Sequence, residues 1–235
     1  MSPDFQDVLA FHRKYGQPCG IRPQLLSVEA FQFRHKFLHE ELKEFRDAQH
    51  LVAQLDGLMD LVYVAIGTAL FVGCPQDGLR NSWPLFHNQV DMVQPIRALP
   101  VIPTRLSDYE IDYHATGIEA CIYQFELASN TNTASLDSIL PLKRLVASAY
   151  QAAVQMSCPW SLCWSHVQRA NMKKVRAASD GSDSTRKSSM DVVKPSGWIA
   201  PDAEIARTLS RSGWEIPSHL AMNLDTGKII DSRFV

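Results

Sequence analysis

The sequence lacks an uninterrupted apolar run long enough to span a membrane, which takes roughly 18 residues or more. Residues 55–73 come closest, but Asp56 and Asp60 interrupt them. No apolar segment follows basic residues near the start of the sequence. We therefore expect neither a signal peptide nor a membrane partner.

The sequence also lacks an excess of charge of either sign, and it has few cysteines. The 23 basic and 25 acidic residues leave a formal net charge of −2, which argues against nucleic acid as a partner. The five cysteines are odd in number and scattered. They suit free thiols in a reducing cytoplasm, which is the host cytoplasm if the protein is viral. No internal repeat divides the 235 residues, and an apolar content of 46% allows one sizeable core.

Acidic side chains, by contrast, gather on two neighbouring predicted helices. Glu40, Glu41 and Glu44 border the apolar stripe of the first helix, and Asp56 and Asp60 lie one turn apart on the second. Like charges at this spacing repel each other, and more strongly once water is excluded. A divalent cation would turn that repulsion into attraction, and Mg²⁺ and Mn²⁺ prefer carboxylate oxygens. The alternative interpretation is a solvated acidic face.

Helical periodicity predicts an all-α chain. The predicted helices cover residues 4–15, 27–50, 51–72, 112–128, 135–156 and 160–178, and a short helix in the tail ends near residue 212. Because Pro141 is best tolerated in a first turn, the fifth helix is expected to begin nearer Ile139. Prolines predict an irregular segment at 75–113, and polar composition predicts a mobile loop at 179–189. One small hairpin is the only β structure expected.

Four motifs, taken in order, resemble the all-α NTP pyrophosphohydrolases, the superfamily of MazG, phosphoribosyl-ATP pyrophosphohydrolase and the dimeric dUTPases. Two of them are the acidic ones: E-E-x-x-E at 40–44, and D-x-x-x-D-L-x-Y-V at 56–64 followed by G-T-A at 67–69. The other two are similar to phage-type MazG-like members: F-H-x-x-Y-G at 11–16, and N-M-K-K-V at 171–175 followed by V-K-P, Trp198 and Pro201-Asp202. The resemblance covers residues 6–74 and 164–205.

The resemblance implies a MazG-like bundle of four or five helices in a single domain, 1–235. Residues 75–160 would be an insertion containing a helical pair, and the mostly irregular tail at 190–235 would close the site. The superfamily implies a homodimer or homotetramer. We expect its contacts at Gly67-Thr68-Ala69 and on the helices within 112–156.

The resemblance also implies a reaction, namely cleavage of a (d)NTP between its α and β phosphorus to give (d)NMP and pyrophosphate. Its role would be nucleotide-pool control, with a purine such as (d)GTP among the substrates considered. Two or three Mg²⁺ or Mn²⁺ ions would be held by Glu41, Glu44, Asp60 and Asp56, with Glu40 as a further ligand. Glu41 or Glu40 would serve as the general base.

One residue departs from the superfamily pattern. Its usual second motif, E-x-x-D, places an acid where this chain has Gly57. Asp56 stands one residue earlier, still within a turn of Asp60, and is the candidate replacement.

The substrate-binding candidates come from four segments. Asn171 and Lys174 would bind the β and γ phosphates, and Lys194 would close over them. His12 and Tyr63 are candidates for contact with the base. The alternatives are solvated surface lysines and core aromatic residues.

Two further functions remain open. One is a different enzyme of the superfamily, either a dUTPase-type member or a phosphoribosyl-ATP hydrolase, although the latter is typically much shorter. The other is a non-catalytic helical nucleotide-binding or scaffold protein, to which Gly57 lends support.

Overall fold

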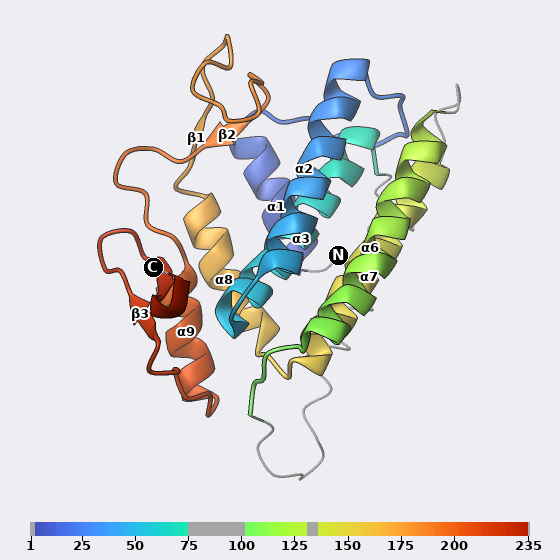
Figure 1. The fold of residues 1–235 in the computed structure, drawn as a ribbon. Helices are drawn as coiled ribbons and strands as arrows, with labels where there is room; N and C mark the ends of the chain where they lie inside the picture. Colours follow the sequence, from blue (N-terminus) through green and yellow to red (C-terminus); the bar gives the residue numbers. More distant parts are fainter. Residues whose placement is uncertain (1–2, 75–101, 131–135, 235) are drawn as a thin grey trace.

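The computed structural model describes residues 3–74, 102–130 and 136–234, and it confirms the all-α class. Helix α3 (Leu51–Val72) runs through the centre of the molecule (Figure 1). On one side it packs against α2 (Val28–Asp47) and α7 (Ile139–Gln155), the last preceded by the 3₁₀ helix η1 (Leu136–Ser138). Helix α6 (Asp108–Ser129) packs in turn against α2 and α7. On the other side it packs against α1 (Pro3–Lys14), α8 (Trp160–Asn171) and α9 (Asp202–Arg211).

Helix α3 is also the one helix of the described residues that is long and apolar enough to cross a membrane. Its most apolar 18-residue window is 89% buried inside the fold. A helix enclosed on all sides reads as apolar all round because each face meets another helix. The length and composition of α3 are therefore those expected of the core helix of a soluble protein.

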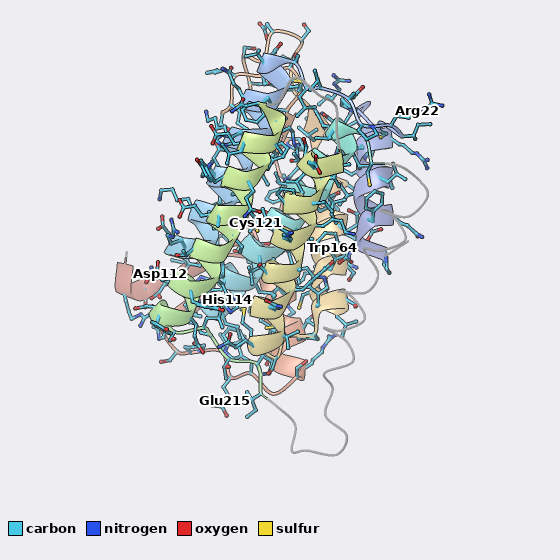
Figure 2. All side chains as sticks on the ribbon, turned by 90° about the vertical axis from the view of Figure 1, so that its right-hand side faces the viewer. Arg22, Asp112, His114, Cys121, Trp164 and Glu215 are labelled. Atoms are coloured by element: carbon cyan, nitrogen blue, oxygen red, sulfur yellow. The ribbon has the colours of Figure 1, made fainter. Side chains whose placement is uncertain are left out.

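Helices α2, α3, α6 and α7 form a four-helix unit around a continuous apolar core. Figure 2 views the molecule from the side of α6 and α7, which lie next to each other across that face. Between them, the His114 ring is hydrogen-bonded to Gln155 Oε1 at 2.9 Å. The predicted helical pair thus covers the side of α3 that faces away from α1.

The buried side chain of Gln54 on α3 binds the backbone of Leu106, just before α6 begins. Its Nε2 donates to the Leu106 carbonyl at 3.2 Å, and its Oε1 accepts from the Leu106 N–H at 2.9 Å. Ser107 and Glu110 then form a capping box that starts α6. Helix α6 therefore begins at Asp108 rather than at 112 as predicted. Residues 75–101 of the predicted irregular segment lie outside the described residues.

Local signals set the start of α2 and the end of α3, whereas α2 ends at Asp47 and not at 50 as predicted. The Ser27 hydroxyl accepts from the Ala30 N–H at 3.1 Å and caps α2. Gly73 ends α3 in the left-handed conformation, with φ +95°. Helix α7 begins at Ile139, which confirms the expectation drawn from Pro141.

The predicted helix at 160–178 was wrong in its last turns. Helix α8 ends at Asn171, and β1 (Val175–Arg176) follows, paired antiparallel with β2 (Val192–Val193). The Tyr15 hydroxyl contacts the carbonyl oxygens of Asn171 and Lys174, at 3.2 and 2.6 Å. These contacts from Tyr15, the residue after α1, hold the chain as it leaves α8, and no local pattern could reveal them.

The expected hairpin is present in the tail, where β3 (Leu220–Met222) pairs with β4 (Ile229–Asp231) before the 3₁₀ helix η2 (Ser232–Phe234). Gly227, with φ +72°, occupies the turn. The tail is more regular than predicted, because α9 packs against α3 and α8.

Candidate active site

The short connection between α2 and α3 brings the predicted acids together. Burial, followed by the charges of Asp60 and Glu44, raises the pKa of Glu41 well above its ordinary value. Burial and Asp60 likewise raise the pKa of Asp56 well above the ordinary value. Glu44 lies at the exposed edge, where partial burial and the charge of Asp60 also raise its pKa. These four carboxylates form one electrostatic cluster.

Two oxygens of this cluster are buried without a hydrogen-bond partner: Glu41 Oε2 and Asp56 Oδ1. Buried polar atoms are nearly always paired, so such atoms need a ligand or some other explanation. In the described parts of the chain, no three His, Cys, Asp or Glu side chains converge closely enough to hold an ion as they stand. The donor chemistry nevertheless suits a hard divalent cation.

Gly57, the departure from the superfamily pattern, has a structural reason. A Cβ at this position would lie 3.0 Å from both Cα and N of Phe45 on α2. Glycine therefore lets the two acidic helices approach closely. A side chain at 57 would meet backbone, whereas Asp56 belongs to the acid cluster.

Adding that one carbon is expected to destabilise the fold. Gly57→Ala should lower the free energy of unfolding by about 1–2 kcal/mol, because overpacking outweighs the gain in helix propensity. Gly117→Ala on α6 is the matched control, since nothing lies within 4 Å of the added carbon. The control should gain about 0.5–1 kcal/mol. Urea unfolding measures both variants, and equal stabilisation of the two would contradict this account.

Glu40 lies beside the cluster and is paired with cations. Its Oε2 accepts from Arg186 Nε at 2.5 Å, and its Oε1 is 3.8 Å from Lys36 Nζ. The structure thus places Glu40 next to Glu41 but in contact with a loop from the other end of the chain.

The two predicted lysines share one aromatic ring near the acids. The ring of Trp198 is 5.7 Å from Lys174 Nζ and 4.7 Å from Lys194 Nζ. Its indole N–H donates to the Ala170 carbonyl at 2.9 Å. The pairing of Val175 with Val193 sets these two lysines side by side at the end of the β1–β2 ribbon. Burial lowers the pKa of Lys174, and the charge of Asp60 opposes that shift.

One pocket joins the acids to the substrate-binding candidates. Six of the ten predicted site residues line it: His12, Glu41, Asp60, Tyr63, Asn171 and Lys174. Glu40, Glu44, Asp56 and Lys194 lie outside this lining. Aromatic residues of α1 and α2 and residues 190–192 at the start of β2 also line it, together with Gln17, Arg34 and Val64.

His12 is held as a neutral ring at the inner end of α1. It is 2% exposed, and its Nδ1 donates to the Pro18 carbonyl at 2.8 Å, which leaves Nε2 as an acceptor. Gly67 makes room for it, because a Cβ there would lie 2.8 Å from His12 Nε2. Burial, followed by the charge of Arg34, lowers the pKa of His12 to about 3.

This burial predicts an acid-sensitive fold. The unfolded chain binds a proton at His12 below its ordinary pKa of 6.5, whereas the folded protein does not until about pH 3. Stability from this group is therefore complete above 6.5 and falls with pH, by about 2 kcal/mol at pH 5. His12→Gln should flatten the dependence of unfolding free energy on pH between 5 and 8. An unchanged slope would contradict the burial of a neutral ring.

Tyr63 is fixed by neighbours on α8. Its hydroxyl donates to Gln168 Oε1 at 2.8 Å, and its ring stacks on Trp164 with centroids 5.5 Å apart. Figure 2 labels Trp164. Tyr63 therefore serves as a core aromatic residue whose edge reaches the pocket.

The sequence patterns missed three charged residues of the site. Arg34 is buried, donates to Thr68 Oγ1 and to the Val64 carbonyl, and has its pKa lowered to about 9, first by burial. Arg34 precedes Glu41 by two helical turns, so both lie on the same face of α2. That spacing could have identified Arg34 as a site residue. Arg186 and Asp191 come from the polar segment after β1, where no periodicity marks a side chain.

Comparison with known proteins bears on the first three helices. Residues 3–81, about a third of the chain, match the family model described as phosphoribosyl-ATP pyrophosphohydrolase. Searches of curated proteins and of solved structures each found no match. The matched segment holds α1, α2 and α3, and hence all the acids of the α2–α3 cluster. The family model that matches this acidic hairpin belongs to the MazG-like all-α NTP pyrophosphohydrolase superfamily.

Proposed function

We propose that the protein is a metal-dependent nucleoside triphosphate pyrophosphohydrolase, which cleaves the α–β anhydride of a (d)NTP to (d)NMP and pyrophosphate. The observation that carries this proposal is Glu41. It is a buried carboxylate with an unpartnered oxygen, crowded by other acids and facing the charge of Lys174. A site built of acids on one side and lysines on the other suits a metal-bound anionic substrate.

The acids would act on the metal and on water. Glu41, Glu44, Asp60 and Asp56 would hold two or three Mg²⁺ or Mn²⁺ ions. When bound, these ions supply charge neutralisation and a water of lowered pKa. Glu41, or Glu40 beside it, would accept the proton of the attacking water.

The cations would act on the phosphates. The charges of Asp60 and Glu41 act on Lys174 and favour its charged form. Its ammonium would therefore contact phosphate oxygens next to the metal. Lys194 shares the Trp198 ring and would bind the same tail from the solvent side. Asn171, on the pocket wall, would donate its amide, and His12 Nε2 would accept from the base.

We propose nucleotide-pool control in the cytoplasm, with (d)GTP among the substrates and a phage-type role. None of the five cysteines forms a disulfide, in keeping with a reducing compartment.

For the homodimer or homotetramer, the Gly67-Thr68-Ala69 patch is excluded as a contact, because it is buried within the same chain against His12 and Arg34. Helix α6 instead exposes Tyr109, Tyr113 and Tyr123, at 81%, 69% and 58%. Subunit contact is therefore proposed on α6.

A second candidate substrate is phosphoribosyl-ATP, which the description of the matched family favours. Its triphosphate offers the same α–β anhydride, so the same acids and lysines would serve. Only the pocket beyond the phosphates would distinguish the two substrates.

An end-point screen tests the function. All canonical NTPs and dNTPs, dUTP and phosphoribosyl-ATP are incubated with and without Mg²⁺ or Mn²⁺, and monophosphate and pyrophosphate are scored. The expected result is metal-dependent pyrophosphate release, with the substrate preference read from the same plate. Turnover of no nucleotide with either metal would reject the enzyme and favour a non-catalytic binding protein.

A further inference from the structure

Arg186 ties the loop after β1 to the acidic helix α2. Its Nε donates to Glu40 at 2.5 Å, its Nη2 is 3.8 Å from Glu41 Oε1, and its Nη1 is 3.2 Å from both carboxylate oxygens of Asp191. The guanidinium carbon lies 3.6 Å from the centroid of the Phe37 ring. The side chain is only 16% exposed. A largely buried cation with three carboxylates and an aromatic face is a built site rather than a loose surface pair.

The same contacts set Arg186 against the proposed metal ligands. Glu40 and Glu41 are both candidates for binding the ion, and Glu41 keeps its other oxygen buried and unpartnered. A carboxylate that shares its charge with a guanidinium binds a second cation more weakly. The two cations therefore compete for these acids.

We infer that Arg186 is a positioning residue that holds the place of a divalent cation at Glu40 and Glu41 and releases these carboxylates when metal binds. The inference rests on the proposed function. Asp191 and Phe37 are not among the metal candidates, so they retain the guanidinium at the edge of the site. Released from Glu40 and Glu41, its planar fork suits the phosphate oxygens of an incoming triphosphate.

Metal affinity, measured without substrate, tests the competition. Mn²⁺ binding to the full chain is followed by calorimetry for the wild-type protein and for Arg186→Gln. Arg186→Gln removes the guanidinium that competes with the ion for Glu40 and Glu41, so Mn²⁺ binding should tighten about tenfold. Lys187→Gln is the matched control, because it removes the same charge from the neighbouring exposed position. The control should bind within about twofold of wild type, since exposed charges are screened.

Folded Arg186→Gln that binds Mn²⁺ with wild-type or weaker affinity would overturn the inference. If that variant does not fold, Arg186→Lys decides, because lysine keeps the charge but loses the fork. The Arg186→Lys variant should bind Mn²⁺ more tightly than the wild-type protein does, and equal affinity would overturn the inference. Binding of Mn²⁺ with equal affinity in all proteins leaves the proposed function standing, whereas absence of Mn²⁺ binding in every protein rejects both.

Discussion

Replacing Glu41 with glutamine is expected to lower kcat/KM for the nucleotide about a thousandfold, within the range for loss of a general base. Among the acids that the structure describes, Glu41 alone is buried, keeps an oxygen without a partner and lines the pocket. Glutamine keeps the shape but loses the charge that would hold metal and accept a proton. Steady-state kinetics with Mg²⁺, scoring pyrophosphate, measure the effect.

The control for this substitution lies on the same helix. Glu29→Gln makes the identical change at an exposed position in the first turn of α2 and should leave kcat/KM unchanged. The Glu41→Gln variant should keep the fold, because burial already disfavours the charged form of Glu41 in the metal-free protein. Retention of more than about a tenth of wild-type activity would remove Glu41 from the catalytic role.

Lys174→Met is expected to lower kcat/KM about a hundredfold, the value of one charge-assisted contact to the substrate. Burial lowers the pKa of Lys174, yet Asp60 and Glu41 favour its charged form, so a cation faces the acids. Methionine keeps most of the side chain's volume but removes the ammonium that lies over the Trp198 ring. The loss should fall on both KM and kcat, because phosphate charge is present in the ground state and grows at the leaving group.

The neighbouring residue supplies the comparison for Lys174. Lys173 is exposed, and Lys173→Met changes the same net charge one position away. Its kinetics should match those of the wild-type protein. If both variants lose activity equally, Lys174 acts only through the overall field of the protein and not at the substrate.

The sequence alone determined what short-range spacing encodes. Helical periodicity placed the acids of α2 and α3 beside their apolar stripes, and cap residues such as Ser27 and Gly73 fixed the helix ends. Because the connection between α2 and α3 is short, these helices pack as neighbours, and Glu41, Glu44, Asp56 and Asp60 form one cluster. These features depend on contacts within a turn or between consecutive helices.

Only the tertiary structure decided which distant groups meet those acids. Arg186 binds Glu40 across 146 residues of sequence. Tyr15, near the start of the chain, binds the carbonyl of Asn171 at the end of α8. Gly57 reads in the sequence as a lost ligand, but its contact with Phe45 shows a packing requirement between two helices. Contacts at such separations depend on how whole helices pack, and local spacing carries no record of that packing.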